Sequence, residues 1–177
     1  MKVILVRNGD ADPNSEDIPL TEKGILQSKL VSKELSKYNI GKTYSSDLLR
    51  AKQTCEMFTK DFIEDKRLKE IYRVLIGGPI KEGTSKEREI NDKKRADEIF
   101  NELLKNKRNV VVFCHGNIIR YFVKKVKKIE GVNQWKDMKI DNCSITIISN
   151  ELEKLEVEEI NKNDYLVQEG VVGYIKD

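Results

Sequence analysis

The chain has a single histidine and few of the residues that interrupt or cross-link a fold. Its 177 residues include three prolines, three cysteines and ten glycines, which excludes a collagen-like repeat and a disulfide framework. The cysteines stand far apart, at Cys55, Cys114 and Cys143, so we expect reduced thiols. The length predicts one domain, over residues 1–177.

Long apolar runs and a strong net charge are also missing. No segment approaches the roughly 20 apolar residues that span a bilayer, and the apolar run after Met1 is too short for a signal peptide. We therefore expect a cytoplasmic protein with no membrane partner. Basic residues number 33 and acidic residues 30, a net charge of +3, which gives no reason to expect a nucleic-acid partner. A nucleic-acid or surface-binding module built on Lys124–Lys128 is a weaker hypothesis, because those lysines face away from an apolar helical stripe.

Two uninterrupted apolar runs, Val3–Val6 and Val110–Cys114, are typical of strands buried on both faces. Helical patterns follow both strands, and Thr21 can cap the first helix. Ser144–Ser149 and Glu153–Glu158 favour an antiparallel hairpin. The pattern predicts an α/β fold, a three-layer sandwich with a mostly parallel sheet, helices on both faces and an antiparallel edge strand.

The segment Asp61–Gly83 has no regular apolar pattern, and Gly77-Gly78-Pro79 marks a turn within it. We interpret it as a loop that covers the functional site. Thr84 and Glu87 have the spacing of a capping box, which predicts that a helix starts there.

Polar side chains follow the two strongest strands. One strand ends in Arg7-Asn8-Gly9 and the other in Cys114-His115-Gly116, and ligands in such sheets bind beyond the carboxyl ends of the strands. Arg50, at the start of the helix after Ser45-Ser46, can reach the same crevice, and a guanidinium fork suits phosphate. Each residue alone is more often a solvated charge or a structural histidine. Their joint placement favours an anion site of Arg7, Arg50 and His115.

Five segments resemble the histidine-phosphatase (phosphoglycerate-mutase-like) superfamily over nearly the whole chain. They are Leu5-Val6-Arg7-Asn8-Gly9, residues 20–27, residues 45–54, residues 114–120 and residues 142–146. Around Gly77–Ile80 and His115–Tyr121 the chain is most similar to the mitochondrial phosphoglycerate-mutase-like protein serine/threonine phosphatase within that family. The family has a histidine where this chain has Asn8.

The resemblance implies two-step phosphoryl transfer through a phosphohistidine, with neither a metal nor an organic cofactor. Arg7, Arg50 and His115 would bind the phosphoryl oxygens. Asn8 occupies the place of the catalytic nucleophile, and its carboxamide nitrogen has no basic lone pair. The chain as written is therefore expected to be inactive.

A second departure concerns the glutamate that many family members use as proton donor. It aligns near Ile76, where no carboxyl group stands. Glu70 or Glu82 could substitute, although a surface charge is the expected role of each.

Two interpretations of function stay open. The chain is either a phosphatase for a phosphomonoester or phosphorylated protein, with its nucleophile replaced to stop turnover, or a natural pseudophosphatase that binds a phosphorylated ligand. A phosphoglycerate mutase is less favoured, because isomerisation requires acid/base catalysis and a closed pocket. The sequence assigns no oligomeric state.

Overall fold

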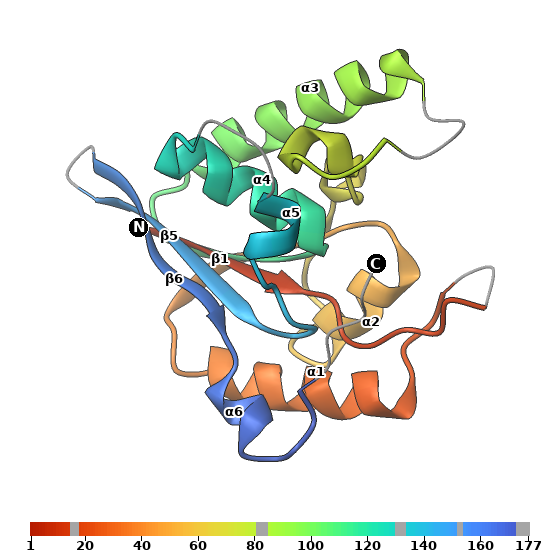
Figure 1. Cartoon of the computed structure of the whole chain (residues 1–177). Coiled ribbons are helices and arrows are strands. Elements are labelled where there is room, and N and C mark those ends of the chain that lie inside the picture. The colour runs from red at the N-terminus through yellow and green to blue at the C-terminus, as the bar shows by residue number, and fades with distance from the viewer. Residues whose placement is uncertain (15–17, 81–84, 130–133, 152–153, 173–177) are drawn as a thin grey trace.

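The computed structural model describes residues 1–14, 18–80, 85–129, 134–151 and 154–172 (Figure 1). Six strands form one sheet in the order β3-β2-β4-β1-β5-β6. β1, β2, β3 and β4 run parallel, while β5 and β6 pair antiparallel beside β1. This confirms the predicted mixed sheet with its antiparallel edge. The strands are β1 Lys2–Arg7, β2 Ile40–Ser45, β3 Ile63–Glu64, β4 Asn109–Cys114, β5 Ile145–Glu151 and β6 Lys154–Lys162.

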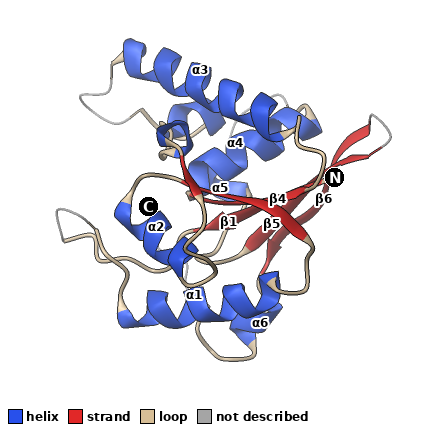
Figure 2. Cartoon of the chain, turned by 180° about the vertical axis from the view of Figure 1, so that it is seen from behind, coloured by secondary structure: helices blue, strands red, loops and turns tan. Residues whose placement is uncertain are grey.

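Helices cover both faces of the sheet, as predicted. α3, α4 and α5 lie on one face, and α1, α2 and α6 lie on the other (Figures 1 and 2). The helices are α1 Glu22–Leu35, α2 Leu49–Glu56, α3 Lys86–Leu103, α4 Gly116–Lys127, α5 Gln134–Asp137 and α6 Asp164–Val167.

Alternate side chains of β1 point to opposite faces of the sheet, and each set packs in one of two hydrophobic clusters. Val3 and Leu5 pack in the cluster that includes residues of α3 and α4. Ile4 and Val6 point the other way, into the cluster with residues of α1 and α6. All four side chains are fully buried, and each such burial stabilises the fold by roughly 1.5–3 kcal/mol. β1 is therefore fixed from both sides, which holds its carboxyl end in place.

The starts of two helices test the capping predictions. Thr21 caps α1 as expected, with Oγ1 accepting from the Gly24 backbone N–H at 3.0 Å. The predicted capping box is wrong, because Ser85 is the N-cap of α3 and accepts from the Arg88 N–H at 3.2 Å. Thr84 itself lies outside the described residues. A serine next to the predicted threonine offers the same oxygen, one residue closer to the apolar stripe.

The segment 61–83 is irregular, as predicted, and contains only short elements where it is described. These are β3, η1 Lys66–Leu68 and η2 Arg73–Ile76. The three cysteines are free and buried, which agrees with the prediction of reduced thiols. Within the described ranges, no helix combines the length and apolar character needed to cross a membrane.

Candidate functional site

The carboxyl ends of β1 and β4 lie side by side and carry the two predicted loop segments. Arg7 pairs with Cys114 in the parallel ladder, and the Asn8 N–H donates to the Cys114 carbonyl oxygen at 2.9 Å. A cavity of about 380 Å³ opens at this edge. It brings together all four residues predicted for the site, and it is lined by Arg7, Asn8, Ala11, Pro13, Ile18, Arg50, Glu70, Ile71, Tyr72, Arg73, Arg88, His115, Gly116, Asn117 and Asn142.

Arg7 and Arg50 reach the pocket from different elements. Arg7 is the last residue of β1 and is only 6% exposed, with Nη1 donating to the Ile140 carbonyl oxygen at 2.6 Å. Its guanidinium lies close to Gly116, where a Cβ would stand 3.5 Å from Arg7 Nε. Arg50 comes from the first turn of α2, so the two cations converge on one cavity.

Asn8 and His115 contact each other at the floor of the pocket. His115 Nδ1 lies 3.0 Å from Asn8 Oδ1, and His115 Nε2 lies 2.9 Å from Ser46 Oγ. Asn8 Nδ2 donates to the Gly9 carbonyl oxygen at 2.8 Å, and Asn142 Nδ2 donates to the Asn8 carbonyl oxygen at 2.9 Å. Both ends of the Asn8 carboxamide are therefore engaged by the protein.

The surroundings of His115 favour a neutral ring. Burial lowers the pKa of His115 well below its ordinary value of 6.5, and the nearby charges of Arg50 and Arg7 lower it further. The imidazole is 1% exposed. A neutral imidazole carries one N–H and one acceptor nitrogen, so it can donate to an anion without itself holding a charge.

Glu70 lies in the pocket, which corrects the expectation that it is a surface charge. Its two carboxylate oxygens each accept a backbone N–H, from Asn117 and from Ile118, both at 3.1 Å. Desolvation raises the pKa of the Glu70 carboxyl, against the lowering effect of these N–H groups and of Arg7. Ile76, which stands in the region where the family's acid was expected, is fully buried in the apolar core. Glu82 lies outside the described residues.

Sequence reasoning named Glu70 only as a possible substitute for the family's acid, because the segment has no period that assigns it to a face. One signal was available. In the sequence, Lys69 and Glu70 stand between Leu68 and the pair Ile71-Tyr72, and apolar and aromatic residues of this kind are often buried. The structure buries all three, which places Glu70 next to the core.

Two further arginines that the sequence analysis did not select, Arg73 and Arg88, line the outer part of the pocket. Arg73 is in η2, and Arg88 is in the first turn of α3. The Arg88 guanidinium lies 5.9 Å from the centre of the Tyr72 ring, and its Nε is 3.7 Å from Asp92. Among the residues that the structure describes, four arginines and one glutamate therefore line the cavity, a strongly positive lining for a chain whose net charge is +3.

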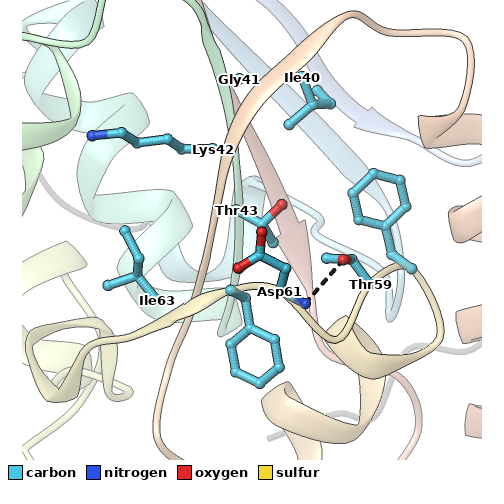
Figure 3. Close-up of a pocket in the computed structure, with 9 residues that line it drawn as sticks. Ile40, Gly41, Lys42, Thr43, Thr59, Asp61 and Ile63 are labelled. Carbon is cyan, nitrogen blue, oxygen red and sulfur yellow. Dashed lines mark hydrogen bonds between the residues drawn. The ribbon is translucent and has the colours of Figure 1, made fainter.

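A second cavity, of about 430 Å³, lies against the amino-terminal part of β2, between Ile40–Thr43 and Phe58–Ile63 (Figure 3). It holds Lys42 and Asp61 but no histidine or arginine. Among the residues that the structure describes, no three His, Cys, Asp or Glu side chains are grouped to hold a metal ion.

Comparisons with known proteins agree with this fold. The family model of the histidine phosphatase superfamily (branch 1) matches residues 3–92 and 80–163. The 2,3-bisphosphoglycerate-dependent phosphoglycerate mutase of Thermoplasma acidophilum is 28% identical over 186 aligned positions, covering 88% of this chain and 90% of its own length.

Two solved structures share the fold at lower sequence identity. A phosphoserine phosphatase mutant from Entamoeba histolytica in complex with phosphoserine is 22% identical, with a TM-score of 0.76, and the match covers 93% of this chain and 98% of that one. A mycobacterial glucosyl-3-phosphoglycerate phosphatase in complex with VO3 is 20% identical, with a TM-score of 0.75 and coverage of 91% and 98%. Because the family model matches most of this chain, the chain belongs to the histidine phosphatase superfamily.

Proposed function

We propose that the pocket binds the phosphoryl group of a small phosphomonoester, and that Asn8 alone prevents its hydrolysis. The observation that carries the proposal is that Arg7, Arg50 and His115 line one cavity together with Asn8, whose side chain contacts His115. Guanidinium groups bind phosphate oxygens in a forked geometry, and a neutral imidazole N–H adds a third donor. Three donors from three different elements can hold the phosphoryl oxygens while a fourth group attacks phosphorus.

With histidine at position 8, the chemistry would run in two steps. The imidazole nitrogen attacks phosphorus, and the bond from phosphorus to the ester oxygen breaks as a phosphohistidine forms. Water then attacks that phosphorus, which releases inorganic phosphate and restores the imidazole. In the chain as written, Asn8 Oδ1 contacts His115 and Nδ2 donates to Gly9, so the first step has no nucleophile.

Glu70 is our candidate for the acid of the first step and the base of the second. Its carboxyl group lines the pocket and has a raised pKa, and a general acid needs a pKa shifted toward the working pH. A carboxyl group in this place also weakens the case for a natural pseudophosphatase. Two departures from the family, Asn8 and Ile76, favoured that interpretation, and Glu70 can supply the carboxyl group that is absent at Ile76. We therefore favour a phosphatase with one replaced residue over a natural pseudophosphatase and over a mutase.

The outer arginines favour a substrate with a second anionic group. Arg73 and Arg88 line the pocket together with the inner pair, so a carboxylate or second phosphate on the ester would meet further guanidinium donors. Solved structures of the same fold hold phosphoserine and 3-phosphoglyceric acid, both of which carry a carboxylate. A phosphorylated protein would have to insert its side chain into the same cavity of about 380 Å³, which suits a small ester better.

The first prediction tests the proposed function by restoring the nucleophile. The Asn8→His variant is expected to hydrolyse a chromogenic phosphomonoester, while the unaltered chain stays at background, because only the variant can form the covalent intermediate. Adding Arg50→Ala to Asn8→His should return most of that activity to background. A well-folded Asn8→His protein without hydrolysis would count against the phosphatase and favour the phospho-ligand-binding alternative.

A further inference from the structure

His115 lies between two side chains that contact its two ring nitrogens from opposite sides. Nδ1 faces Asn8, which lines the pocket. Nε2 faces Ser46, which is fully buried. The ring thus has a pocket side and a core side, and its single proton can serve a ligand only from the pocket side.

The neighbours of the ring determine where that proton lies. Because Asn8 Nδ2 donates to the Gly9 carbonyl oxygen, Asn8 presents its oxygen to His115, and that oxygen can only accept. Nδ1 must therefore carry the N–H. A neutral ring then has an acceptor at Nε2, and the Ser46 hydroxyl must donate to it.

The backbone holds Ser46 in the position that this requires. The Ser46 N–H donates to the Phe113 carbonyl oxygen at 2.9 Å, which joins the loop after β2 to the strand that leads into His115. Ser46 Oγ also accepts the Leu48 N–H at 3.3 Å. This contact uses one lone pair of the Ser46 oxygen, and it leaves the hydroxyl proton able to point at the imidazole.

We propose that Ser46 is a positioning residue for His115: its hydroxyl donates to Nε2 and keeps the ring proton on Nδ1, where it is donated to Asn8 Oδ1 in the free protein and to a phosphoryl oxygen that takes that place in the pocket. Ser46 does not touch the ligand. It disfavours the tautomer with the proton on Nε2, in which Nδ1 would present a lone pair to an incoming anion. The role for the Nδ1 proton rests on the proposed function, whereas the position of that proton in the free protein does not.

The chain suits a direct measurement because His115 is its only histidine. In a ¹⁵N-histidine-labelled protein, a long-range proton–nitrogen correlation spectrum at neutral pH contains the signals of this one ring. We expect Nδ1 in the protonated range and Nε2 in the unprotonated range. A proton on Nε2, or a doubly protonated ring, would overturn the proposal without any variant being made.

Ser46→Ala and Ser45→Ala form a matched pair for the second test. Both hydroxyls are fully buried, and Ser45 Oγ donates to the Ser46 carbonyl oxygen rather than to the ring. Ser46→Ala should move the Nε2 signal toward that of a nitrogen accepting no hydrogen bond. It should also lower the preference for the Nδ1–H tautomer about fivefold, the equivalent of one ordinary hydrogen bond. Ser45→Ala should leave both nitrogen signals near their positions in the unaltered chain.

Binding of vanadate separates this inference from the proposed function. We expect Ser46→Ala to bind vanadate about fivefold more weakly than Ser45→Ala does. Equal nitrogen shifts in the two variants would overturn the positioning role. If neither variant nor the unaltered chain binds vanadate, while Nδ1 carries the proton, the proposed function fails and the tautomer assignment stands.

Discussion

Two cavities lie beside the sheet, and they differ in character rather than in size. Against the amino-terminal part of β2 lies the cavity of about 430 Å³ with Ile40, Phe58 and Phe62 in its lining. At the carboxyl ends of β1 and β4 lies the pocket of about 380 Å³ with four arginines, Glu70 and His115. Volume alone therefore does not distinguish the functional site.

The arrangement of charged groups does distinguish it. In the first cavity, the Lys42 side chain extends away from the loop that carries Thr59 and Asp61 (Figure 3). In the pocket, cationic groups from β1, α2, η2 and α3 converge. Parallel strands bring their carboxyl ends together at one edge, where loops and helix starts can supply polar groups. Variants in the two cavities can therefore serve as test and control for each other.

Replacing a carboxyl group should give the largest difference in hydrolysis rate between variants of the two cavities. In the Asn8→His background, Glu70→Gln should slow hydrolysis of an alkyl phosphate by about 10²-fold or more, because a general acid contributes 10²–10⁴. The loss should be much smaller for a nitrophenyl phosphate, whose leaving group departs without protonation. Steady-state kinetics with both esters measures this, and Asp61→Asn should change neither rate. Equal losses on the two esters would contradict an acid role for Glu70.

Much of this site follows from the sequence because it sits at the ends of strongly patterned elements. Val3–Val6 and Val110–Cys114 identify their strands by apolar content alone, and strand direction then places Arg7, Asn8 and His115 together. Glu70 and Arg73 could not be placed in this way, since they belong to a segment whose path depends on tertiary packing. The sequence showed Ser46 only as part of the family-like segment 45–54. Its contact with His115 depends on the pairing of β2 with β4.

The outer arginines offer a second contrast, between ligands with and without a second charge. By calorimetry, 3-phosphoglycerate should bind the unaltered chain more tightly than glycerol 3-phosphate. In the double variant Arg73→Gln/Arg88→Gln, the ratio of the two affinities should fall about tenfold, the equivalent of one charge-assisted hydrogen bond. Inorganic phosphate should bind both proteins to a similar degree. If the preference persists in the double variant, the assignment of these arginines to a second anionic group is wrong.

A smaller effect is expected in the pH dependence of stability. The pKa of His115 lies well below 6.5 in the folded protein, so only the unfolded chain gains a proton as the pH falls just below 6.5. The stability linked to the neutral ring is complete above that pH. It is lost below it, by up to about 1.4 kcal/mol per pH unit, until the folded pKa is reached.

Glu70, with its raised pKa, acts in the opposite direction. The folded protein takes up its proton at a higher pH than the unfolded chain does, so acidification favours the folded state there. His115→Gln therefore isolates the histidine contribution. Denaturant unfolding at several pH values between 7 and 5 should show less acid destabilisation in this variant than in the unaltered chain. Parallel pH profiles would contradict a neutral, buried His115.

Binding of inorganic phosphate to the unaltered chain tests the central claim most directly. Phosphate should raise the melting temperature, because a ligand that binds only the native state stabilises it, by about 2.7 kcal/mol at 100 times Kd. Arg50→Ala in the pocket should remove most of that stabilisation, whereas Lys42→Ala in the other cavity should leave it intact. No stabilisation by phosphate, or equal stabilisation of the unaltered and Arg50→Ala proteins, would contradict a phosphoryl-binding pocket at the carboxyl ends of β1 and β4.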